Sequence, residues 1–208
     1  IRKAVLFLLS CNLSEILTVF LSILFRLPSV LLPLQILWIN LATDVIPALA
    51  ISLDPAEVDV MNRPPKKKSE DIITFQHKFQ IVLYGILMAL GVLGVYFWTL
   101  FFHSDAYSLA NEMGFHTLVF SQLFFVINVR EASIFRKPDM LWANPWLLWG
   151  IVVSMLLQVS ITFIPVFQEV LEIVPLSFKE WSTVLAGSLL PTIIAQLSKL
   201  VRSSREDG

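Results

Sequence analysis

Long apolar stretches alternate along the chain with short polar ones. Each apolar stretch is close to the roughly 20 residues that a helix needs to cross the hydrocarbon core of a bilayer, about 30 Å thick. The pattern therefore predicts an all-α membrane protein, a six-helix transmembrane bundle that forms one domain over residues 1–208. The predicted spans are residues 4–25, 34–53, 79–102, 113–129, 146–167 and 181–197.

The basic residues lie mostly on one side of this predicted bundle. Six crossings put both termini on the same side, together with the longest loop, residues 54–78. Only Arg26 and Lys179 fall on the opposite side. Cytoplasmic segments of membrane proteins are rich in Lys and Arg, so both termini and the loop 54–78 are predicted to be cytoplasmic. The basic residues on that side are Arg2, Lys3, Arg63, Lys66, Lys67, Lys68, Lys78, Arg130, Arg136, Lys137, Lys199, Arg202 and Arg205.

Composition supports the membrane location and excludes several other classes of protein. Of the 208 residues, 56% are hydrophobic and 15% are charged, and the mean hydropathy is +0.76, which is too apolar for an ordinary soluble domain. The formal net charge is −1 and the basic residues are confined to a few stretches, so a nucleic-acid partner is not expected. The single cysteine, Cys11, can form neither an internal disulfide nor a zinc cluster.

Two carboxylates stand out within the predicted spans, Glu15 in the first and Asp44 in the second. A charged group inside a bilayer costs several kcal/mol unless it has a partner, and it usually marks an ion or proton path. Asn12 lies one helical turn before Glu15, and Asn40 and Thr43 share a helix face with Asp44. A short Pro-bounded turn joins the two spans into an antiparallel hairpin, so the two polar faces can meet.

These side chains predict a binding site for a hard cation. Counting the backbone carbonyl of Thr43, which Pro47 cannot hydrogen-bond, the two faces offer about five to seven oxygens, and Ca²⁺ takes six to eight. Na⁺ and K⁺ also accept oxygen ligands, whereas Zn²⁺ and Cu⁺ prefer Cys and His. The alternative is that the amides and the hydroxyl only hydrogen-bond between helices. For Gln122 in the fourth span, interhelical hydrogen bonding is the preferred interpretation and a place at a neighbouring ion site is the alternative.

Three stretches carry a resemblance to a known family: NLSE at 12–15, LQILWINLATDVIPA at 34–48 and DVMNRPP at 59–65. With them, the chain resembles the last six membrane helices of P-type cation-transporting ATPases of the calcium-pump kind. The resemblance implies that the loop 54–78 faces the phosphorylation domain of such a pump. It also implies that the ion ligands are Asn12, Glu15, Asn40, Thr43 and Asp44.

The resemblance further implies what the complete protein does. Such a pump would export Ca²⁺ from the cytoplasm, with counter-transport of H⁺, while an aspartyl phosphate forms and breaks. ATP and Mg²⁺ would be used by domains that this stretch lacks, so this stretch alone is not expected to hydrolyse ATP. Those domains and the first four membrane helices of the pump are the expected partners, together with the lipid bilayer.

Two positions depart from the pattern of reticulum-type calcium pumps. Val45 stands where those pumps have Gly, which is similar to the sodium and proton/potassium pumps, although Asn40 is calcium-like. Gln122 stands at a position that is Glu in two-site calcium pumps, which leaves the number of ions open. The alternatives are therefore a pump for Na⁺ or another monovalent cation, a secondary transporter with Glu15 and Asp44 as a proton relay, or a non-catalytic membrane protein.

Overall fold

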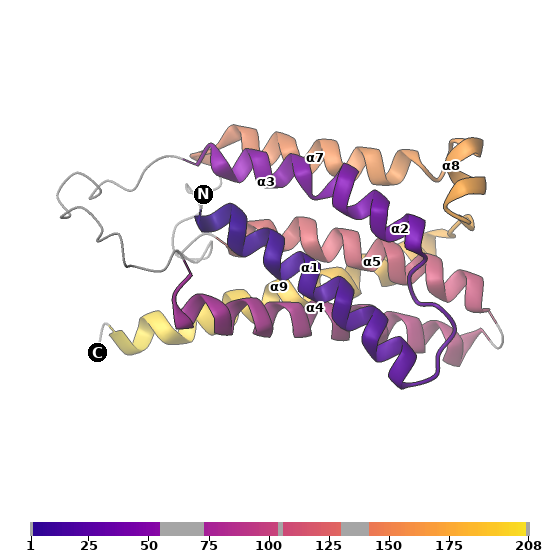
Figure 1. The fold of residues 1–208 in the computed structure, drawn as a ribbon, viewed down its shortest axis with the longest axis horizontal. Coiled ribbons are helices and arrows are strands. Elements are labelled where there is room, and N and C mark those ends of the chain that lie inside the picture. Colours follow the sequence, from indigo (N-terminus) through magenta and orange to yellow (C-terminus); the bar gives the residue numbers. More distant parts are fainter. Residues whose placement is uncertain (1, 55–72, 104–105, 130–141, 207–208) are drawn as a thin grey trace.

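The structure is a computed structural model, and it describes residues 2–54, 73–103, 106–129 and 142–206. Every regular element in this part of the chain is a helix. The longer helices run side by side along one axis, and the start of α1 and the end of α9 lie at the same end of the bundle (Figure 1). The elements are α1 (Arg2–Leu24), α2 (Pro33–Trp38), η1 (Ile39–Thr43), α3 (Val45–Ser52), α4 (Phe75–Phe102), α5 (Tyr107–Asn128), α7 (Pro145–Ser160), α8 (Pro165–Val170) and α9 (Phe178–Glu206).

The first two spans form the predicted antiparallel hairpin (Figure 1). After α1, Arg26 adopts a left-handed backbone conformation with φ 55°. The backbone N–H of Leu27 then donates to the carbonyl of Ser22 at 2.9 Å, the bond that closes a helix in a Schellman motif. The chain returns through α2, where Pro33 occupies the first helical position and its fixed φ favours a helix start.

The second span is interrupted, although the sequence predicted one continuous helix. Its middle segment, η1, is a π-helix, and the backbone N–H of Asp44 donates to the carbonyl of Ile39, five residues earlier, at 3.0 Å. The helix then resumes as α3, with the N–H of Ala48 donating to the carbonyl of Asp44 at 3.1 Å. Such wide turns are rare and occur often at functional sites.

Helix α5 lies in the interior of the bundle, where it contacts α4, α9, α7, α1, α3 and η1. Most of its residues are buried against protein, so it can carry polar side chains that would be costly against lipid. The predicted fourth span began at residue 113, but the helix begins at Tyr107 and also includes Asn111 and Glu112. The predicted span therefore left out a third buried carboxylate, Glu112, which is fully enclosed in α5.

The predicted fifth span, residues 146–167, is wrong in its extent. Helix α7 ends at Ser160, and a separate short helix, α8, begins at Pro165. Pro165 has no backbone N–H to continue α7, and the preceding residue, Ile164, is extended with φ −101° and ψ 114°, as the steric clash with a following proline requires. Helix α8 lies at the end of the bundle opposite the chain termini (Figure 1).

The chain is an integral, multi-pass membrane protein. Among the described residues, four segments are long and apolar enough to cross a bilayer: α1, α2 through α3, α4, and residues Phe178–Lys199 of α9. Large apolar side chains on the first two of these face outward, with Ile16, Ile23 and Leu41 exposed by 64%, 70% and 71%. Lipid would cover such an apolar surface. Helix α5 is more polar and α7 has only 16 residues, so six crossings and cytoplasmic termini remain predictions.

Candidate cation-binding site

The candidate site lies in a polar layer between two apolar clusters of the core. The cluster toward the termini includes Leu6 and Phe7 of α1 and Phe125 of α5. The cluster toward α8 includes Leu118 and Leu123 of α5. The polar residues of α1, of η1 and of the middle of α5 lie between these clusters along the helices, so the packing on both sides keeps water away from them.

Three helices bring side chains together at Glu15, which is 4% exposed. The side-chain amide of Asn40, from η1, donates through Nδ2 to Oε2 of Glu15 at 2.6 Å. The amide of Gln122, from α5, donates through Nε2 to Oε1 at 3.0 Å. Each carboxylate oxygen of Glu15 therefore accepts one hydrogen bond, and each bond comes from a different helix. The structure places Gln122 in the same cluster as Glu15.

Asp44 lies at the break between η1 and α3 and is 1% exposed. Neither of its carboxylate oxygens accepts a hydrogen bond from any described residue. The groups that act on it electrostatically are the carboxylate of Glu15 and the thiol of Cys11. A buried carboxylate without hydrogen bonds is strongly unfavourable, and a bound cation would remove that cost. The surroundings of Asp44 therefore fit a cation.

The remaining predicted residues are less tightly connected. Thr43 is fully buried, and its hydroxyl donates to the carbonyl of Ile39 at 3.0 Å, which leaves the oxygen lone pairs of Thr43 free to accept. Asn12 is partly buried, and its side chain makes no hydrogen bond to a described residue. The structure therefore joins Asn40 and Gln122 to Glu15 by hydrogen bonds, but it joins neither Thr43 nor Asn12 to them.

The backbone around Asp44 adds oxygen acceptors. Pro47 is buried within α3 and has no N–H for the carbonyl of Thr43, four residues earlier. The next N–H, that of Ala48, is already used by the carbonyl of Asp44. The wide turn of η1 and Pro47 together loosen the regular hydrogen bonding of the helix next to the two carboxylates. No pattern of side chains in the sequence predicted the π-helical turn.

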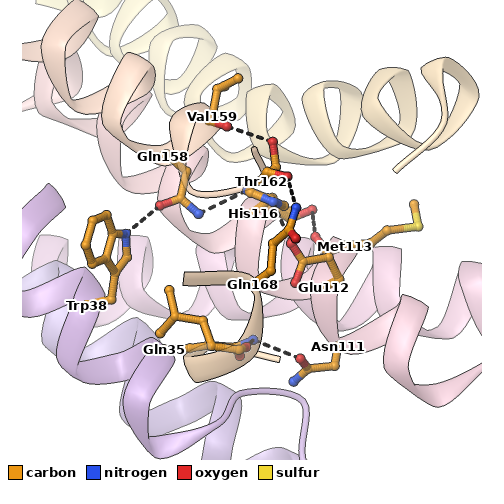
Figure 2. A network of polar contacts seen from close by, with 12 residues as sticks. Gln35, Trp38, Asn111, Glu112, Met113, His116, Gln158, Val159, Thr162 and Gln168 are labelled. Atoms are coloured by element: carbon orange, nitrogen blue, oxygen red, sulfur yellow. Dashed lines mark hydrogen bonds and ion pairs between the residues drawn. The ribbon is translucent and has the colours of Figure 1, made fainter. Parts of the chain in front are cut away.

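A second buried polar cluster was missed by the sequence analysis. Nε2 of His116 lies 2.7 Å from Oε1 of Glu112, and both side chains are fully enclosed; Figure 2 shows this pair with its neighbours. The two residues are four apart, the spacing at which side chains on a helix meet. The predicted helix began at residue 113 and therefore left Glu112 outside it. The helix that begins at Tyr107 includes both residues and places them on one face.

Most of the loop 54–78, the predicted contact with a phosphorylation domain, lies outside the residues that the structure describes. The loop 54–78 was expected to face a phosphorylation domain, and residues 55–72 of it lie outside the described residues. Its role remains a prediction.

Comparison with known proteins identifies the family. The family model for "Cation transporting ATPase, C-terminus" matches residues 28–201. The chain is 34% identical over 218 residues to Calcium-transporting ATPase 1 of Bacillus cereus, covering 98% of this chain and 24% of that protein. It is 34% identical over 205 residues to a calcium-transporting ATPase of Bacillus subtilis, covering 97% and 23%. It is 28% identical over 228 residues to an endoplasmic reticulum calcium ATPase of Aspergillus fumigatus, covering 95% and 24%.

The chain spans about a quarter of the length of these curated relatives. The family model begins at residue 28, after α1 and Glu15, and includes Asp44, whereas the matches to the two Bacillus proteins cover 98% and 97% of this chain. The chain therefore belongs to the P-type cation-transporting ATPases of the calcium-pump kind and corresponds to their C-terminal membrane region.

Proposed function

We propose that this chain is the ion-binding membrane portion of an ATP-driven pump that exports Ca²⁺ from the cytoplasm and returns H⁺. The names of the relatives, which are calcium-transporting ATPases, support Ca²⁺ as the transported ion. ATP hydrolysis with Mg²⁺ belongs to other domains of the complete protein. The loop 54–78 would contact the phosphorylation domain, so that phosphorylation there changes the positions of the helices that hold the ion.

The observation that carries this proposal is the contrast between two neighbouring buried carboxylates. Glu15 is hydrogen-bonded by two amides, whereas both oxygens of Asp44 lack a hydrogen-bond partner. An ion pair with a basic side chain would resolve this, but no Lys or Arg of the described residues forms one with Asp44. Oxygen-only surroundings with two carboxylates suit Ca²⁺, which would neutralise both charges at once.

The two amides would then change roles when the ion arrives. In the structure, Asn40 and Gln122 turn their N–H groups toward Glu15, and the side-chain carbonyl oxygen of Gln122 has no partner. Rotation about the last side-chain torsion of each amide would exchange the N–H group for the carbonyl oxygen. Glu15 would lose two hydrogen bonds and gain the cation, while Asn40 and Gln122 would supply ligand oxygens beside it. Asn12 and Thr43 would complete the coordination.

The same residues account for the return of H⁺. After the ion leaves toward the far side, two like charges would remain buried next to each other, which is unfavourable for both. Protons from that side would neutralise Glu15 and Asp44 and would be released again when the site reopens to the cytoplasm. The carboxylates therefore carry either the cation or protons, but not both together.

The proposed membrane arrangement has six crossings with cytoplasmic termini and one domain over residues 1–208. Helices α5 and α7 supply the two crossings beyond the four long apolar segments. The direction of α5 and α7 supports these two crossings, because both helices run alongside the other helices (Figure 1). Helix α5 is also enclosed by its neighbours, which explains how a helix of lower hydropathy can lie within the membrane.

A pump for Na⁺ is the alternative, and Val45 was the residue that favoured it. In the structure the Val45 side chain is 40% exposed, so it points away from the buried carboxylates. Its identity changes the outer surface of the second span and not the set of ligand oxygens. Val45 therefore gives no support to Na⁺ over Ca²⁺.

The test is phosphoenzyme formation from labelled ATP by the complete pump in membranes, with Ca²⁺ titrated against Na⁺ and K⁺. We expect activation by micromolar Ca²⁺, with Glu15→Gln requiring at least tenfold more Ca²⁺ or failing to respond. Glu169→Gln is the matched control, since Glu169 lies exposed on α8, far along the chain from the site. Activation by Na⁺ would move the chain to the monovalent pumps, and absence of any phosphoenzyme would contradict pump function.

A further inference from the structure

The Glu112–His116 pair lies outside the proposed cation site and has an unusual environment. Both side chains are fully buried, in the second turn of α5 near the α8 end of the bundle. Apart from His116, no described residue contacts the Glu112 carboxylate as a hydrogen-bond donor or cation. Nε2 of His116 and Oε1 of Glu112 are 2.7 Å apart, but their geometry is not that of a hydrogen bond, and neither Nε2 nor either carboxylate oxygen has a hydrogen-bond partner among the described residues.

A chain of hydrogen bonds fixes which nitrogen of His116 carries the proton of the neutral imidazole (Figure 2). The indole Nε1–H of Trp38 can only donate, and it donates to Oε1 of Gln158 at 2.9 Å. The amide of Gln158 therefore presents its N–H group to Nδ1 of His116, at 3.0 Å. Because Nδ1 of His116 accepts this bond, the imidazole is neutral and carries its proton on Nε2, the nitrogen that lies 2.7 Å from Oε1 of Glu112.

A second proton on the imidazole would break this chain of contacts. Protonated Nδ1 would face the N–H group of Gln158, so two donors would oppose each other. If the Gln158 amide turned over to accept from His116, its N–H group would oppose the indole N–H of Trp38 instead. A proton that enters the pair without disturbing Trp38 therefore binds to the carboxylate of Glu112, which changes from a charge of −1 to neutral.

Aromatic rings enclose the imidazole of His116. The rings of Phe115, Phe120 and Trp181 lie around His116, with the Trp181 ring centroid at 4.7 Å. Among the described residues, none of α2, η1, α3 or α7 carries a charged side chain.

Other titratable groups on the packed elements lie at the same end, toward the surface. They are His103 after α4, Lys179 and Glu180 at the start of α9, and Glu169 and Glu172 at α8 and just after it. None of them forms an ion pair or hydrogen bond with Glu112 or His116. Arg26 after α1 is exposed, and Glu15 of α1 belongs to the cation cluster.

A cavity lies beside the first turns of α5, on the side that faces α4 and the start of α9. It has a volume of about 200 Å³ and lies among α4, α5 and the start of α9. Its lining includes His103, Lys179 and Glu180, together with Met113, the residue that follows Glu112. Titratable groups and space for water therefore reach Met113, the next residue along α5, although neither Glu112 nor His116 lines the cavity.

We propose that Glu112 and His116 form a proton-binding site, separate from the cation site, that exchanges one proton with the compartment at the α8 end. The charge of the pair would act on the second span through Gln158 and Trp38, because Trp38 directly precedes η1, the turn that holds Asn40. Glu112 is the group that binds the proton, and His116, Gln158 and Trp38 are positioning residues. The effect on cation binding rests on the proposed function, whereas proton binding does not.

The first experiment measures proton binding directly. Infrared difference spectra between high and low pH are recorded on the complete pump in its membrane, without Ca²⁺. We expect a carboxylic-acid C=O component that is lost in Glu112→Gln, shifted in Glu112→Asp and retained in Glu169→Gln, the control that removes the component of one exposed carboxyl. If the folded Glu112→Gln protein keeps the complete wild-type band, the proton-binding site is refuted. If Glu112→Gln does not fold, the Glu112→Asp variant provides the test. A shifted band in Glu112→Asp supports proton binding at this position, and an unshifted band refutes it.

The second experiment measures the coupling. Equilibrium binding of Ca²⁺ to the complete protein is followed as a function of pH. Loss of one linked proton reduces the pH dependence of the binding constant by up to tenfold per pH unit. We expect this reduction in Glu112→Gln and also in Trp38→Phe, which keeps an aromatic ring but removes the N–H donor. Trp38→Phe should keep the infrared band. An unchanged pH dependence of Ca²⁺ binding in both variants refutes the coupling between the proton site and the cation site. Absence of Ca²⁺ binding by the wild type refutes the proposed function, but it does not affect the infrared test of proton binding.

Discussion

Glu15 and Asp44 differ in their hydrogen bonding although both are buried carboxylates. The two amides that donate to Glu15 come from η1 and α5, so its position depends on the packing of three helices. Asp44 lies where the second span is interrupted and has no such donors. Loss of the charge at Asp44 therefore removes an interaction that only a cation can supply, whereas loss of the charge at Glu15 also weakens contacts between helices.

Asp44→Asn should abolish ion-dependent phosphorylation from ATP in the complete pump. The substitution keeps the size of the side chain but removes the charge that offsets the cost of removing water from the ion. Because both oxygens of Asp44 lack hydrogen-bond partners, the stability of the protein should not fall, and thermal unfolding without Ca²⁺ should shift little or upward. Phosphoenzyme assays of the variant beside Glu169→Gln test this, and unchanged ion dependence would exclude Asp44 as a ligand.

At the scale of elements, small residues decide how closely α4 and α9 pack. A Cβ atom added at Gly187 in α9 would overlap Cγ2 of Val95 in α4, and Val95 is β-branched and stiff. At Gly91 the same addition would lie 3.3 Å from the carbonyl oxygen of Gly187. At Gly94, by contrast, an added Cβ meets no atom within 4 Å. The close approach of the two helices therefore requires glycine at position 187 but not at position 94.

Gly187→Ala should destabilise the protein by about 1–3 kcal/mol, the usual cost of overpacking a core. Gly94→Ala is the matched control and should be neutral or stabilising by up to about 1 kcal/mol, because Ala favours helix. Unfolding of the purified protein in detergent, followed by circular dichroism, measures both. Equal effects of the two substitutions would show that α4 and α9 do not pack in the described way.

At the scale of the whole molecule, the helices divide the protein into two ends. The start of α1, the end of α9 and the start of α4 lie at one end, and α8 lies at the other (Figure 1). Hydrogen bonds tie the α8 end together: Gln35 of α2 donates to the side chain of Asn111 in α5 at 2.9 Å and to the carbonyl of Leu171 after α8 at 3.1 Å. The proposed orientation puts this end outside the cytoplasm.

Labelling with a membrane-impermeant thiol reagent tests this orientation. The native Cys11 is buried and should not react in sealed vesicles of known orientation. A cysteine at Gln76, exposed at the start of α4, should be labelled only from the cytoplasmic side. A cysteine at Glu169, exposed on α8, should be labelled only from the opposite side. Labelling of both positions from the same side would contradict the proposed topology.

The sequence by itself determined the helical class, the membrane location and the family. Apolar runs near 20 residues have few alternatives to spanning helices, and the cost of a buried charge drew attention to Glu15 and Asp44 without any coordinates. Start and end positions were less certain where a proline or a buried polar residue was involved. The fourth helix begins before Asn111 and Glu112, which interior packing tolerates, and the fifth ends before Pro165.

Only the tertiary structure decided which polar groups meet. Gln122 reaches Glu15 because α5 lies in the interior against both α1 and η1, and a position in one helix does not reveal its neighbours in another. The π-helical turn before Asp44 and the chain of contacts from Trp38 to Glu112 likewise depend on packing between distant segments. Burial cost is a local property that residue types reveal, whereas hydrogen-bond partners depend on how the helices are placed relative to one another.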